Sequence, residues 1–233
     1  GTNGVSGALS FRTGGATKGS SGAIAVKTGA ATSGTAGSMS LVIGSGDTST
    51  GGRVVVNAGE STAHTGGSVS VISGLGSATS SGVFSIKTAD AGANGVSGAL
   101  HFNSGTTSKG SSGSITLETG AAAKGTAGSV SVVIGGGDAG AGGRITINAG
   151  SSTATSSGTG GMISLMTGAG TTTSSGGFSV RTAIAGTNGV SGALSFRTGG
   201  ATEGSSGAVA VKTGAATEGT AGGMCWVIGS GET

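Results

Sequence analysis

The sequence contains no proline and no tyrosine, a single tryptophan and a single cysteine, and only 8% of its 233 residues are charged. One cysteine, Cys225, excludes an intramolecular disulfide. No apolar run approaches the roughly 20 residues of a transmembrane helix, so we expect no membrane span. The 11 Lys and Arg residues are scattered, without a basic cluster or an aromatic stacking platform. Despite a pI near 9.4, nucleic acid is therefore not an expected partner.

Residue patterns for catalysis and metal binding are also lacking. His64 and His101 have no Cys or carboxylate at ligand spacing, whereas zinc needs three or four converging ligands. The glycine-rich strings lack the Gly-Lys-Ser/Thr of phosphate loops, and no serine lies in a nucleophile setting with a base and an acid. The sequence thus predicts no catalytic residue, no metal site and no cofactor, and a protein that is not an enzyme.

What the sequence does contain is glycine, 56 residues of it, arranged in a repeat. The stretch "GALSFRTGGATKGSS" (7–21) is followed directly by "GAIAVKTGAATSGTA" (22–36). Between successive equivalent glycines, eleven of fourteen intervals are 15 residues, two are 16 and one is 18. We number positions within each repeat from this glycine. So regular a period is typical of a repeat architecture.

Positions 3 and 5 of each repeat are large and apolar, and this alternation with period two predicts a β-strand. Stacked strands would align these side chains in an apolar ladder, which is the predicted core. Its representative residues are Leu9, Phe11, Ile24, Val26, Met39, Leu41, Val54, Val56, Leu100, Phe102, Leu194 and Phe196.

The expected fold is all-β: a parallel β-solenoid (β-helix) of about 15 coils with 15 residues per coil. The second half of each repeat offers only small residues inward, so we expect a thin cross-section of two sheets. Glycines at positions 1, 8 and often 13 are expected at corners that need a positive φ. The sequence does not set the handedness.

A longer period groups the repeats into copies of six, which start near residues 1, 92 and 186. Asn-Gly pairs at Asn3, Asn94 and Asn188 begin the copies, and the latter two are expected in turns that absorb a sixteenth residue. The 18-residue interval is expected to form an enlarged corner loop. We expect one continuous domain over 1–233, as a section of a longer array. Recent duplication explains the six-repeat period as well as a regularly spaced partner does.

Position 6 points away from the ladder and is usually charged or polar. It is valine in the third repeat of each copy, at Val42, Val133 and Val227. Small residues at position 4 leave the same face flat, which favours close packing of a neighbouring sheet. The three valines are therefore candidate lateral contacts between chains.

The "G-[AS]-Φ-[SA]-Φ-x-T-G" pattern, with strings such as "GSGDTSTGGRVVVNAGE" (44–60) and "SATSSGVFSIKTADAGANGVSGAL" (77–100), resembles large Gly/Ser/Thr-rich repeat proteins of diatoms and related microalgae. The resemblance implies a secreted or cell-surface component of a fibre or adhesive. We expect a structural protein that forms or joins an extracellular fibre by head-to-tail stacking of coils and lateral packing of sheets. Its expected partners are other copies of itself or extracellular matrix components. The alternative is a β-solenoid that binds ice or carbohydrate as an adhesive.

Overall fold

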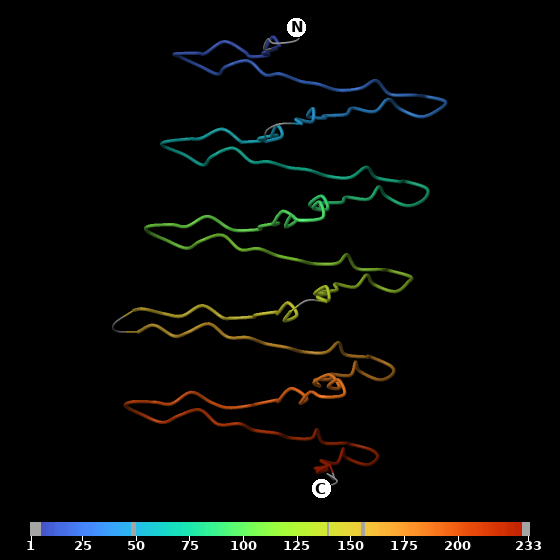
Figure 1. Cartoon of the computed structure of the whole chain (residues 1–233), viewed down its shortest axis with the longest axis vertical. Coiled ribbons are helices and arrows are strands. Elements are labelled where there is room, and N and C mark those ends of the chain that lie inside the picture. Colours follow the sequence, from blue (N-terminus) through green and yellow to red (C-terminus); the bar gives the residue numbers. More distant parts are fainter. Residues whose placement is uncertain (1–5, 48–49, 139, 155–156, 230–233) are drawn as a thin grey trace. The chain divides into compact units, whose positions relative to one another are not determined.

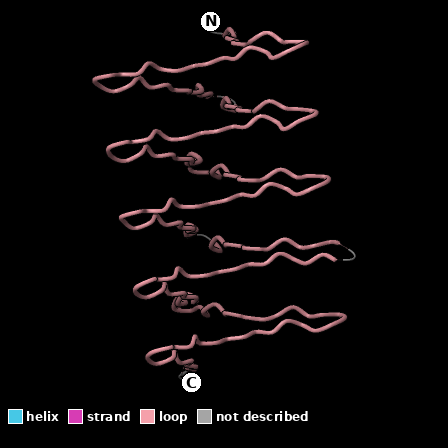
Figure 2. The backbone as a smooth tube through the Cα atoms, turned by 180° about the vertical axis from the view of Figure 1, so that it is seen from behind, coloured by secondary structure: helices cyan, strands magenta, loops and turns pink. Residues whose placement is uncertain are grey.

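The computed structural model describes residues 6–47, 50–138, 140–154 and 157–229. Within these ranges the backbone forms no helix and no β-strand, and it is drawn entirely as loop in Figure 2. The predicted all-β fold, a parallel β-solenoid of 15 coils, is therefore wrong. The chain divides into two units, Gly1–Leu117 and Glu118–Thr233, which are described separately.

Each 15-residue repeat consists of an extended arm and a loop. We call positions 1–7 the arm and the remaining positions the loop, so that the first repeat has arm 7–13 and loop 14–21. The chain bends near the middle of the loops, and Figure 1 shows narrow reversals of the ribbon there. The first unit bends at 17–19, 32–34, 62–64, 77–79 and 108–110, and the second at 123–125, 171–173, 202–204 and 217–219.

Backbone hydrogen bonds between glycines close several of these loops. The amide of Gly67 donates to the carbonyl oxygen of Gly59 at 2.8 Å, and the amide of Gly82 donates to that of Gly74 at 2.9 Å. In the second unit, Gly176 donates in the same way to Gly168 at 3.0 Å. In each case position 8 accepts from position 1 of the next repeat. The loop is thus closed like a small Ω-loop, whose ends lie close together.

Insertions occur inside the loops, as expected. Gly161 donates to Gly150 at 2.8 Å, so the three additional residues of the longest repeat lie between closing glycines. At the 16-residue repeats, Gly95 donates to Gly92 and Gly189 to Gly186, both at 3.0 Å. The turns predicted at Asn94 and Asn188 are therefore confirmed. Neither asparagine has a positive φ, as in a type I turn, and Asn3 lies outside the described residues.

Positive φ angles occur at position 13 of the repeat. Gly19, Gly204 and Gly219 have φ of 96°, 104° and 109°, and Gly34 and Gly110 also lie in this region. A side chain with a Cβ rarely adopts such angles, which explains glycine there. The prediction for position 13 is confirmed at these five glycines and at Gly140, but Gly125, at the same position, has no positive φ. The described glycines at positions 1 and 8 do not have this conformation either.

The structure uses the repeat differently from a solenoid coil. In a solenoid, the backbone groups of one coil bond to the next coil. Here the hydrogen-bonded glycines at positions 8 and 1 are joined within one chain segment, 8 to 11 residues apart. The described arms form no ladder with a neighbour, so their alternating side chains have no sheet to line. No described residue is buried, and the predicted two-sheet cross-section is absent from the described part of the chain.

Candidate interaction surface

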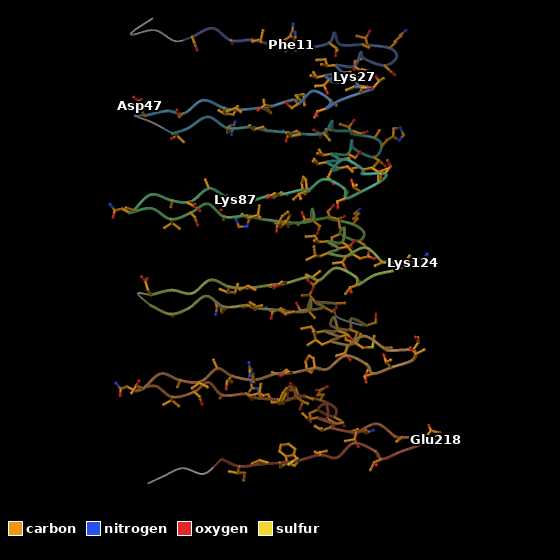
Figure 3. The ribbon with its side chains drawn as sticks, turned by 90° about the vertical axis from the view of Figure 1, so that its right-hand side faces the viewer. Phe11, Lys27, Asp47, Lys87, Lys124 and Glu218 are labelled. Atoms are coloured by element: carbon orange, nitrogen blue, oxygen red, sulfur yellow. The ribbon has the colours of Figure 1, made fainter. Side chains whose placement is uncertain are left out.

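The apolar side chains of the arms are exposed to solvent. In the first repeat Leu9 is 82% exposed and Phe11 is 77% exposed. Across the other predicted ladder residues the exposed fraction runs from 50% at Leu100 to 73% at Val26 and Leu41. Figure 3 shows Phe11 and the charged Lys27 and Lys87 on the arms. Each arm therefore presents two large apolar groups that are available for intermolecular contact.

The candidate lateral contacts are also largely exposed. Val42, Val133 and Val227 are exposed by 80%, 82% and 84%, and they belong to the third repeat of each six-repeat copy. Ile follows each of them directly in the sequence at position 7, so these arms end with two adjacent large apolar residues. Among the arms, those of the third repeat in each copy therefore have the most apolar ends.

Position 7 of the repeat makes a contact that the sequence pattern did not predict. Among the described residues, those intermediate between exposed and buried include Ser73, Thr88, Thr119 and Thr167, all at position 7. The reason is the position-1 glycine of the next repeat: a Cβ atom added at Gly98 would lie 3.5 Å from Cγ2 of Thr88, and one added at Gly128 would lie 3.5 Å from the Cβ of Thr119. The recurrence of Thr at position 7, usually nine residues before a glycine, is the sequence feature that could have indicated this contact.

Replacing Gly52 with alanine is expected to disturb this contact where position 7 is isoleucine. A Cβ atom at Gly52 would overlap Cγ2 of Ile43, whereas one at Gly22 would make ordinary contact with Thr13. Ile43 is 44% exposed, so its side chain can rotate to relieve the overlap. We expect the Gly52→Ala variant to shift the side-chain NMR signals of Ile43, and the Gly22→Ala variant to leave those of Thr13 nearly unchanged. Equal shifts in the two variants would contradict this geometry.

In the described part of the chain, polar side chains from distant segments do not gather into a catalytic or metal-binding site. They contain no group of three His, Cys, Asp or Glu residues placed to hold a metal ion. A shallow hollow of about 370 Å³ is lined by four consecutive residues, Arg181 to Ile184, so it holds no groups from distant segments. Cys225 is exposed as a free thiol. Nor does any helix long and apolar enough to cross a bilayer occur in the described ranges.

Comparison with protein-family models, with curated proteins and with solved structures gives no match to this chain. The resemblance to Gly/Ser/Thr-rich proteins of microalgae therefore stays a prediction from the sequence.

Proposed function

We propose that this chain is a non-enzymatic structural segment that associates with other copies of itself in an extracellular or cell-surface fibre. The observation that carries the proposal is the exposure of the apolar arm residues. Exposed apolar groups in this number are unusual for a soluble monomer and mark surfaces for association. Because every arm repeats the pattern of the next, an intermolecular contact that covers the apolar pair of one arm can be repeated at the other arms.

The small residues around the apolar pair support the same function. Position 4 is mostly Ser or Ala, so a second chain can approach the backbone of an arm closely. The backbone amides and carbonyls of the arms, which form no ladder within the described part of the chain, are available to such a partner. Association would then remove both apolar groups and backbone groups from water. The alternative was a β-solenoid that binds ice or carbohydrate, and the described residues do not form a solenoid.

Sedimentation velocity of the purified chain over a range of concentrations tests the proposal. We expect the average mass to rise with concentration and electron microscopy to show elongated assemblies. Replacing Val42, Val133 and Val227 with glutamine is expected to lower the associated fraction, because these exposed groups would lose their apolar contacts. The matched control replaces the same valines with isoleucine and should retain association. A chain that stays monomeric at every concentration would disprove self-association.

A further inference from the structure

The charged residues are segregated by sign between arms and loops. The arms hold eight of the eleven Lys and Arg residues and one of the eight Asp and Glu residues, Glu118. The loops hold the other three cations and the other seven carboxylates. The arms therefore carry a formal net charge of +7 and the loops a formal net charge of −4.

The arm cations and the loop carboxylates also recur at particular positions of the repeat. The arm cations at position 6 are Arg12, Lys27, Lys87, Arg181, Arg197 and Lys212. The loop carboxylates lie at positions 9, 11 and 12, and those among the described residues are Asp47, Glu60, Asp90, Asp138, Glu203 and Glu218. All twelve side chains are exposed, and Figure 3 shows Asp47 and Glu218 at the outer ends of their loops.

We infer that two copies of this chain associate with an offset of about half a repeat, so that the acidic loops of one copy lie against the basic arms of the other. The inference rests on the proposed self-association and adds its register. Both copies have the same period, so one offset brings together the arm cation and the loop carboxylate of each repeat that carries both: Arg53 with Glu60, Lys87 with Asp90, Arg197 with Glu203 and Lys212 with Glu218. Each exposed ion pair is weak on its own, but a series along two linked chains reinforces itself.

A second copy of the chain fits this charge pattern better than a simple polyanion does. A polyanion would be attracted to the arms and repelled by the carboxylates of every acidic loop it crossed. A second copy supplies cations for the loops and carboxylates for the arms at the same spacing. Like charges facing each other also disfavour the in-register arrangement, in which arm would meet arm.

Three chains of identical net charge test the offset. The first is the wild type. The second, the full swap, replaces the six position-6 cations with Glu and the six described loop carboxylates with Lys, which gives arms of −5 and loops of +8. The third, the half swap, makes Lys87→Glu and Lys212→Glu with Glu60→Lys and Glu203→Lys, which gives arms of +3 and loops of 0 and leaves like charges in all four of these repeats. All three keep the net charge of +3.

We expect the full swap to associate like the wild type in sedimentation, because its two signs remain segregated. The half swap should associate about tenfold more weakly at low salt, because its arms and loops carry like charges in those four repeats, although it has a third as many substitutions as the full swap. Near 1 M salt, where screening acts over about 3 Å, the three chains should converge. Equal association of wild type and half swap would overturn the register but leave self-association standing. Failure of the full swap together with the half swap would also overturn the register, and a monomeric wild type would overturn both proposals.

Discussion

Replacing Phe11, Phe102 and Phe196 together with serine is expected to weaken self-association about a hundredfold. These are the position-5 residues of the first repeat in each copy, and they are exposed by 77%, 63% and 72%. Complete burial of a phenylalanine contributes roughly 1.5–3 kcal/mol, so partial burial of each in an assembly contributes about 1 kcal/mol. Three such losses amount to about 3 kcal/mol, or roughly a hundredfold in the association constant. Sedimentation equilibrium measures this change directly.

The control for this prediction replaces the same three residues with leucine. Leucine keeps most of the apolar area and lacks the ring, so association should fall by less than about tenfold if burial of area is the main term. Wild-type association by the serine variant would show that the arms do not form the interface.

The same serine variant also tests whether the chain has this structure or forms a solenoid. In a solenoid the three phenylalanines would belong to the core, and their loss would unfold the chain. Here they are exposed, so the hydrogen-bonded loops should persist in the monomer. We therefore expect the amide of Gly67, bonded to Gly59, to keep its hydrogen-exchange protection at concentrations where no association occurs.

Several features of the chain could be predicted from its sequence because they depend on local chemistry. A turn at Asn94 depends on a few adjacent residues, and the positive φ of Gly19 depends on the absence of a Cβ. The placement of insertions in loops follows from the same cause: the arm has a strict pattern of side chains, and the loop does not.

The pairing of the arms could not be predicted in the same way. Alternation at Leu9 and Phe11 indicates an extended segment with two faces, but a strand also needs a neighbour that accepts and donates its backbone hydrogen bonds. The pattern contains no information on whether that neighbour belongs to the same chain. In the structure the glycine at position 8, such as Gly59, bonds to Gly67 within the loop. Because the loops are closed locally and the described arms form no ladder, the apolar residues of the arms remain exposed.

Position 7 illustrates a second limit of the pattern. Thr13 continues the period-two alternation, which by itself predicts that Thr13 lies on the same face as Leu9 and Phe11. Its proximity to Gly22 arises from the loop between them, and a periodicity confined to the arm does not describe a contact across a loop.

Replacing Gly76 with alanine is expected to open the loop between Gly74 and Gly82. A Cβ atom at Gly76 would overlap the carbonyl oxygen of Ser80 and lie 2.8 Å from its carbonyl carbon. These are backbone atoms, so a side-chain rotation cannot relieve the overlap, and the loop has to move. We expect the amide of Gly82 to lose its bond to the carbonyl oxygen of Gly74, which is 2.9 Å long in the wild type. A bond of about 0.5–1.5 kcal/mol corresponds to a hydrogen-exchange protection of roughly 2- to 10-fold, which should disappear.

The equivalent glycine in the other unit provides an independent repetition. A Cβ atom at Gly170 would lie 2.8 Å from the carbonyl oxygen of Thr173 and 3.0 Å from the carbonyl carbon of Ser174, so Gly170→Ala should release the amide of Gly176 from Gly168. The control is Gly74→Ala, since a Cβ there would have no neighbour within 4 Å. Its loop should keep the protection of Gly82, although it carries the same added methyl group. If Gly82 stays protected in the Gly76→Ala variant, the loop does not have this closed form, because a closed loop of this geometry has no room for the methyl group.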